Sequence, residues 1–247
     1  MNDYSVYKPL IKEYVFILLA VMAFMEAIGF LVYDIRIGFI ASPIVYPIAV
    51  LKYKEMMLKK RKDKIRSQFK DVLYSMSSSF ATGDHMVHAM EKSISVLENI
   101  HGKGTDMESE LKNMIGKINE TGEDEIELWT DFGKRSGLED IRDFAEVFAS
   151  CRDAGGNIVR TVDRAAEILN QKIGVENEIR IMASQKVAEG RLVGAMPILM
   201  IVFLRLTSPS YMKVMYESTV GRIVMTISML ITIVAFIVTK KVTEIEV

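Results

Sequence analysis

The chain between Leu138 and Lys172 reads LEDIRDFAEVFASCRDAGGNIVRTVDRAAEILNQK and predicts two helices joined by a glycine turn. Apolar residues recur three to four positions apart on both sides of the turn, a spacing that collects side chains on one helix face. Ser136 followed by Glu139 predicts a capping box at the start of the first helix. Gly155 and Gly156 end that helix, because glycine adopts positive φ at little steric cost. We therefore expect an αα-hairpin with one apolar seam, on which the rest of the soluble chain packs. The seam consists of Leu138, Ile141, Phe144, Ala145, Phe148, Cys151, Ile158, Val162, Ala165, Leu169 and Ile173.

Apolar residues concentrate at the two ends of the chain and charges in its middle, although the 247 residues together carry a net charge of only −1. This segregation is typical of a membrane protein with a soluble domain. Residues 1–13 are polar and are expected at the membrane surface. Four transmembrane helices are predicted, and proline inside the second and third is tolerated where neighbours satisfy the freed carbonyls. They are Tyr14–Tyr33, Ile37–Leu51, Leu192–Leu206 (with Pro197) and Ile223–Val238.

Lysine and arginine dominate the segment from Lys52 to Lys70, directly after the second predicted span. A basic cluster beside a span marks the cytoplasmic side, and Lys240 and Lys241 place the C-terminus there as well. The same block could also bind anionic lipid or nucleic acid. No aromatic residue interrupts its densest part, between Lys59 and Arg66, which disfavours nucleic acid. We expect a multi-pass protein of the cytoplasmic membrane with both termini in the cytoplasm.

The middle of the chain predicts one helix after another, with no run of β-branched residues alternating with polar ones. We expect an all-α cytoplasmic bundle of about six helices joined by short loops. Asp84 is expected to cap the second of them, and the sixth is expected to continue towards the third span. The predicted domains are 1–55 (transmembrane hairpin), 56–187 (cytoplasmic bundle) and 188–247 (second hairpin with a short tail).

No motif for catalysis or cofactor binding stands out, so the sequence predicts neither an enzyme nor a bound cofactor. The glycine-containing loops lack the strand and spacing that a phosphate or dinucleotide site needs. The single cysteine excludes an internal disulfide, and Cys151 is interpreted as a packing residue. His85 and His88 could share a metal, but two partly exposed helix residues are the better interpretation.

An acidic run and the glycine turn are the candidate contacts for a partner. A run of charges is either a solvated face or a docking surface for a basic partner, whose association it would steer. The candidates are Glu123, Asp124, Glu125, Gly155, Gly156 and Asn157.

Polar and small residues in the spans form a second group of candidates. Glu26 lies inside the first span, where an ionisable group is costly, and it is either a functional group or a structural one paired between helices. Arg36 and Arg205 are its candidate partners, and Arg205 can also reach the membrane interface. Gly190 and Gly194 have the spacing that allows close approach of two membrane helices.

These features, taken in order, resemble the platform proteins of tight-adherence (Tad) pilus systems, TadB and TadC, which carry the domain of the type II secretion F protein. The resemblance covers about residues 60–247, within which the serine-rich 75–79 and the segment 99–127 depart from the family's pattern. It rests on the segments Ser78–Gly83, Ala89–Glu91, Phe148–Asn157, Ala188–Leu192 and Pro209–Tyr211, and on Pro197 inside a span.

The resemblance implies a membrane platform that couples a cytoplasmic assembly ATPase to the movement of pilin subunits. Related secretion F proteins contain two copies of the domain, so pairing with a second copy or a sister subunit is also implied. A membrane signalling or transport protein with a helical cytoplasmic domain is the alternative.

Overall fold

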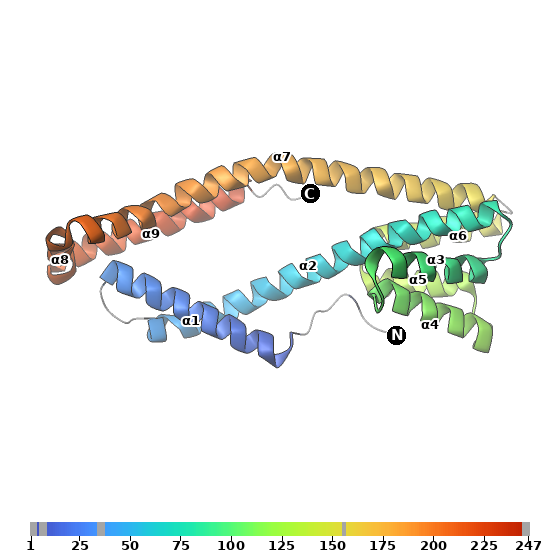
Figure 1. Ribbon diagram of the computed structural model, residues 1–247, viewed down its shortest axis with the longest axis horizontal. Helices are drawn as coiled ribbons and strands as arrows, with labels where there is room; N and C mark the ends of the chain where they lie inside the picture. Colours follow the sequence, from blue (N-terminus) through green and yellow to red (C-terminus); the bar gives the residue numbers. More distant parts are fainter. Residues whose placement is uncertain (1–3, 5–8, 34–37, 155–156, 244–247) are drawn as a thin grey trace. The chain divides into compact units, whose positions relative to one another are not determined.

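Every regular element that the computed structural model describes, over residues 4, 9–33, 38–154 and 157–243, is an α-helix, which confirms the all-α class (Figure 1). The helices are α1 (Ile11–Tyr33), α2 (Gly38–Ala81), α3 (Met86–His101), α4 (Asp106–Thr121), α5 (Glu125–Ser136), α6 (Glu139–Asp153), α7 (Ile158–Thr207), α8 (Pro209–Glu217) and α9 (Thr219–Thr243).

The chain divides into two structural units. The bundle unit comprises residues 1–8 and 53–174, and the apolar unit comprises residues 9–52 and 175–247. The unit boundaries after residue 52 and after residue 174 fall inside helices, because α2 and α7 continue from one unit into the other. The expected continuation of the sixth bundle helix is therefore confirmed, as α7 runs from Ile158 to Thr207.

An aromatic cluster lies at the centre of the bundle unit. Phe144 of α6 contacts Phe69 of α2, Trp129 of α5 and its own neighbour Phe148, with ring centroids 5.5, 5.2 and 5.8 Å away. All four side chains are buried. Rings at these separations add specific edge and stacking interactions to the free energy of apolar burial. The cluster thus joins α2, α5 and α6, and α3 packs closely on α4 beside them (Figure 1).

The predicted seam of the α6–α7 hairpin is buried in most of its length. Ile141, Phe144, Ala145 and Phe148 of α6 are buried, as are Val162 and Leu169 of α7. On α7 the buried alanine is Ala166, whereas Ala165 is only partly buried, and Cys151 is also only partly covered. The face that α7 turns to the core is thus rotated slightly from the predicted one.

Two predicted helix caps are wrong. Ser136 is the last residue of α5, and the N-cap of α6 is Leu138, which makes no side-chain cap. The Ser136 hydroxyl donates to the Gly133 carbonyl and accepts from the Leu138 N–H at 3.3 Å. Gly137 follows with φ 61°, a left-handed C-cap that glycine adopts without strain. Asp84 does not cap α3 either: the N-cap is His85, which makes no side-chain cap, and Asp84 instead accepts from Lys92 at 2.6 Å.

A capping box does occur at Thr105, directly before α4. The Thr105 hydroxyl accepts from the Glu108 backbone N–H at 3.1 Å, and the Glu108 carboxylate accepts in return from the backbone N–H groups of Gly104 and Thr105. This exchange satisfies orphan donors at the start of α4.

The apolar unit contains helices long and apolar enough to cross a membrane. Over the described residues two helices qualify, at Ile11–Leu31 and within α7, and a third qualifies if α8 and α9 count as one bent span. The predicted second span overlaps the beginning of α2, and its first residue, Ile37, lies outside the described ranges. The segment Thr207–Gly221 between the last two predicted spans is expected to be a loop, and this prediction is wrong, because Pro209–Glu217 forms α8. Proline lies in the first turn of α8, where its missing N–H costs nothing.

Candidate partner-contact surface

A groove of about 1190 Å³ opens on the bundle unit along α6 and the start of α7. Its floor is apolar, since Phe69, Phe144 and Leu169 belong to the buried core. Val147 and Ile168 also line it, although each is 51% exposed. The remaining lining is Leu73, Asp140, Asp143, Ser150, Cys151, Asn157, Arg160, Thr161, Asp163, Arg164, Ala165 and Glu167. An apolar floor with exposed aliphatic side chains and charged neighbours has the composition of a protein-binding groove.

Two interactions connect the helices that form the groove. Lys172 of α7 donates to Asp140 of α6 at 2.8 Å, and Asp140 also pairs with Arg66 of α2. Further along, the Thr161 hydroxyl of α7 donates to the Cys151 sulfur of α6 at 3.1 Å. Because both positions join α6 to α7, they hold the two helices at a set separation. Cys151 therefore does more than fill space on the predicted seam.

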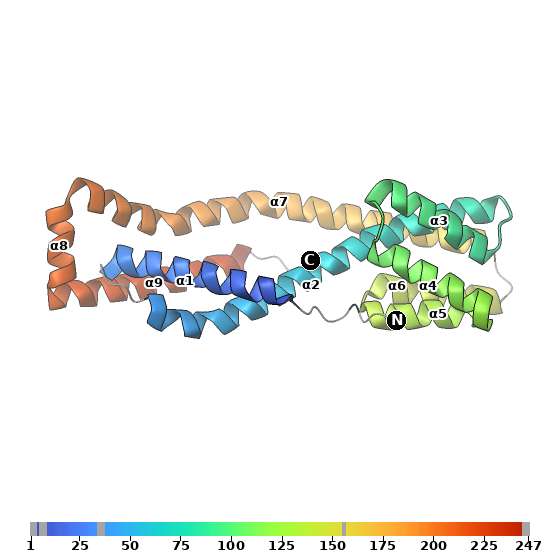
Figure 2. The ribbon, with the colours of Figure 1, turned by 60° about the horizontal axis from the view of Figure 1, so that its bottom comes forward.

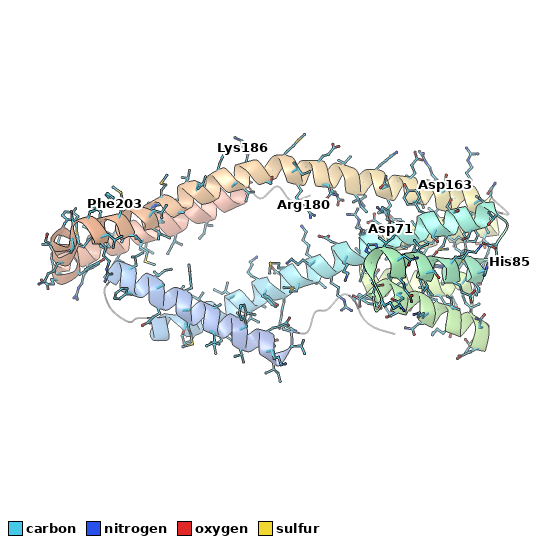
Figure 3. All side chains as sticks on the ribbon, in the orientation of Figure 1. Asp71, His85, Asp163, Arg180, Lys186 and Phe203 are labelled. Carbon is cyan, nitrogen blue, oxygen red and sulfur yellow. The ribbon has the colours of Figure 1, made fainter. Side chains whose placement is uncertain are left out.

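Helix α2 is fastened to its neighbours by polar contacts as well. Ser77 donates to Asp163 of α7 at 3.1 Å, and Asp71 pairs with His101 of α3 at 2.7 Å. Figure 3 shows Asp71 on α2 and Asp163 on α7. Together with Arg66, these contacts connect α2 to α3, α6 and α7.

The acidic run does not present three equivalent free carboxylates. Lys117 donates to Glu123 at 2.8 Å. Asp124 accepts from the Ile126 backbone N–H at 2.8 Å as the N-cap of α5, and Arg152 of α6 donates to both of its oxygens. The hydrogen bond from Arg152, with that from Ile126, lowers the pKa of Asp124. Burial raises the pKa of Glu125. Two of the three charges are thus largely used to join helices.

The glycine turn lies partly outside the description. Gly155 and Gly156 belong to the residues that the structure does not describe, whereas Asn157 is exposed at the edge of the groove. Its side-chain oxygen accepts from the Arg160 backbone N–H at 3.1 Å, a local bond that caps the start of α7. Of the three predicted turn residues, Asn157 thus lies in the lining of the groove.

Tyr4 occupies a position that the sequence analysis missed. It was expected at the membrane surface, but it is fully buried in the bundle unit, where its hydroxyl donates to Glu110 of α4 at 2.9 Å. Arg135 of α5 pairs with the same carboxylate and with Asp131 at 2.6 Å. Burial, together with the charge of Glu110, raises the pKa of Tyr4. A single tyrosine in a polar segment carries no signal for such burial.

The described intramembrane candidates lie on α1 and α7 of the apolar unit. Arg205 donates to the Phe30 carbonyl at the end of α1, and its guanidinium lies 4.1 Å from the centre of the Phe30 ring. Glu26 is partly buried one turn earlier on α1. Gly190 and Gly194 are partly buried and one turn apart on α7, and Pro197 is exposed within the same helix. Arg36 lies outside the described residues.

Histidine and cysteine do not gather into a metal site over the part of the chain that the structure describes. His88 lies 3.8 Å from Asp84, which precedes α3, and 3.4 Å from Glu91 on the exposed side of α3.

No family model, curated protein or solved structure matches the chain. The groove, the two helices shared by both units and the sequence resemblance are the features that bear on function.

Proposed function

We propose that this protein is a cytoplasmic-membrane platform subunit, which couples a secretion or pilus-assembly ATPase to the movement of pilin subunits. In this role it has four spans, a cytoplasmic bundle of about six helices and both termini in the cytoplasm. It works beside a second copy or a sister subunit, and it does no chemistry itself. The resemblance to TadB, TadC and the secretion F domain suggests the proposal, and a fold by itself does not decide function.

The continuity of α2 and α7 is the observation that carries the proposal. In each helix one part contributes core residues to the bundle unit, such as Leu73 and Leu169, and another part belongs to the apolar unit. Each helix keeps its backbone hydrogen bonds as far as an internal proline in its apolar part, Pro47 of α2 and Pro197 of α7, and a hydrogen-bonded helix resists changes in length. In the proposed role a displacement of the bundle is passed along these two helices, which continue from one unit into the other without a loop.

Contacts at the end of α1 support the proposed topology. Arg205, near the end of α7, and Tyr216 of α8 donate to the carbonyls of Phe30 and Leu31. The carbonyls at a helix C-terminus lack intrahelical partners, and cationic donors satisfy them well. These bonds bring the ends of α1 and α7 to one level. With α2 and α9 returning from that level, the basic segment after residue 51 and the C-terminus both lie on the opposite, cytoplasmic face.

The groove between α6 and α7, with Asn157 in its lining, is the proposed contact for the ATPase, and the acidic run and the glycine turn stay further candidate contacts. A partner helix with an apolar stripe would cover Val147 and Ile168 and leave the charged residues around them hydrated. Pushing on this groove moves α7 directly and moves α2 through Ser77 and Asp140, which contact Asp163 and Arg66.

Cross-linked affinity purification from native membranes tests the proposal. The parent chain should recover a P-loop secretion ATPase together with a second protein of this architecture. The double variant Val147→Asp with Ile168→Asp should lose the ATPase, because it puts charges on the groove.

A matched control is Ile100→Asp on α3, which is 60% exposed and does not line the groove. It should recover the ATPase like the parent. If the parent recovers neither protein while remaining folded, the platform proposal is wrong. If all three chains recover the ATPase equally, the contact lies elsewhere on the bundle.

A further inference from the structure

From the geometry around α8 we infer that this helix lies flat in the outer lipid interface, as a membrane-surface anchor. The inference needs only that α1, α7 and α9 cross a bilayer, and it is independent of the pilus-assembly proposal. Helix α9 has 25 residues in all, which is long enough to cross a bilayer without α8. The exposed face of α8 thus contacts the boundary between lipid headgroups and acyl chains.

The turn from α8 to α9 is specified by local contacts. The two helix axes meet at 97°, across a break at Ser218. Ser218 ends α8 by donating its backbone N–H to the Val214 carbonyl, and it caps α9 by accepting from the Gly221 N–H at 3.2 Å. A side chain at residue 221 would place Cβ 2.5 Å from the Met215 carbonyl, so only glycine permits this approach. Figure 2 shows α8 lying across from the end of α7 to the start of α9.

The depth of α8 is set by its contacts with α1. Tyr216 donates to the Leu31 carbonyl at 2.8 Å, and Arg205 stacks on Phe30 and lies 5.7 Å from the Tyr216 ring. Arginine and aromatic side chains concentrate at the membrane–water boundary, where the ring and the polar end are both satisfied. A helix at right angles to α9 at this level runs parallel to the membrane surface.

The exposed surface of α8 has two different flanks. Tyr211 and Val214, three residues apart and therefore neighbours on the helix, are 53% and 65% exposed. Ser210, Lys213 and Glu217 form the other flank, and Lys213 pairs with Glu217 at 3.7 Å. The ion pair would be costly in hydrocarbon, whereas the exposed tyrosine and valine favour apolar surroundings. The interface satisfies both flanks, as it does for other amphipathic surface helices.

Spin-label accessibility in lipid nanodiscs tests this inference. Single cysteines replace Tyr211, Val214, Lys213 and Glu217 in a Cys151→Ser chain, with Leu199→Cys as the deep lipid reference and Lys103→Cys as the water reference. The labels at 211 and 214 should show an oxygen-to-nickel-chelate accessibility ratio several-fold above those at 213 and 217. They should also lie at a shallower depth than the label at 199.

Three results would overturn the inference. Labels that all match residue 103 would put α8 in water, and labels that all match residue 199 would make α8 part of a broken span. Labels that neither reagent reaches would mean that protein covers this face. Tyr211→Trp, read by quenching with lipids brominated at different depths and corrected for the parent's Trp129, gives an independent depth in a chain with Cys151 intact.

Discussion

Phe144 and Phe203 are both phenylalanines, but they lie in different surroundings. In the bundle unit Phe144 is buried among three other aromatic rings, whereas Phe203 on α7 in the apolar unit is 58% exposed (Figure 3). The polar contacts differ in the same way: in the bundle unit they connect helices along their lengths, as at Asp140. In the apolar unit Arg205 and Tyr216 meet carbonyls at the end of α1. One unit thus folds against water and the other is suited to lipid, which already provides apolar surroundings.

Truncation of the two phenylalanines to alanine should show the largest difference in stability between the two units. Phe144→Ala should lower the free energy of unfolding of the bundle by about 3–5 kcal/mol, because it leaves a cavity in a close-packed core. Phe203→Ala should change the free energy of unfolding by no more than about 0.5 kcal/mol, because the Phe203 side chain is exposed outside the packed core. Denaturant unfolding followed by the fluorescence of Trp129, which is buried beside Phe144, measures both. Equal losses would mean that the apolar unit has a packed core of its own.

Two tyrosines offer the next contrast. Tyr4→Phe should cost about 1.5–3 kcal/mol, because it removes a hydrogen bond to the charged, fully buried Glu110. Tyr211→Phe on the exposed flank of α8 should be neutral within about 0.5 kcal/mol. The same unfolding assay applies, with limited proteolysis near the N-terminus as a second readout. If Tyr4→Phe unfolds like the parent, the N-terminal segment is not anchored in the bundle.

The smallest effect is expected at Asp124. Asp124→Asn removes the charge that pairs with Arg152 but keeps a good N-cap, and it should lower Tm at pH 7 by about 2 °C. The folded pKa of Asp124 is lowered, first by the hydrogen bond from Arg152. Its stabilising contribution is therefore full above the unfolded pKa of about 3.9 and is lost as pH falls through the folded pKa.

Thermal melts at pH 7 and at pH 3 or below check the Asp124 prediction. The difference between parent and variant should shrink towards zero on the acid side. A difference that persists there would assign the effect of Asp124 to capping and not to the ion pair.

Helix periodicity and the segregation of apolar and charged residues were enough to predict the all-α class, the α6–α7 hairpin and the long α7. The wrong predictions concern residues whose type fits two different local structures equally well. Ser136 has the sequence spacing of an α6 cap, yet Gly137 ends α5 directly after it, so its hydroxyl bonds back into α5. The loop expected after Thr207 is a helix, since proline inside an apolar hairpin signals a turn and a first helical position equally well.

The candidate site was anticipated only in part. Asn157 lines the groove, but the acidic run has a structural use that its composition did not indicate. Asp124 pairs with Arg152, which lies 28 residues further along the chain, so no local pattern contains this contact. The groove itself depends on Val147 and Ile168, which belong to different helices and fit no motif. Pairings between helices are set by tertiary packing, and a local pattern does not contain them.

By itself the sequence determined the all-α class and the separation of apolar helices from the charged middle of the chain, because backbone propensity and side-chain transfer free energies act locally. Only the tertiary structure decided that Tyr4 is buried against Glu110 and that Arg205 binds the end of α1. It alone decided, too, that α6 and α7 leave an open groove between them. Each of these depends on where distant helices meet, and that is set by the packing of whole apolar faces.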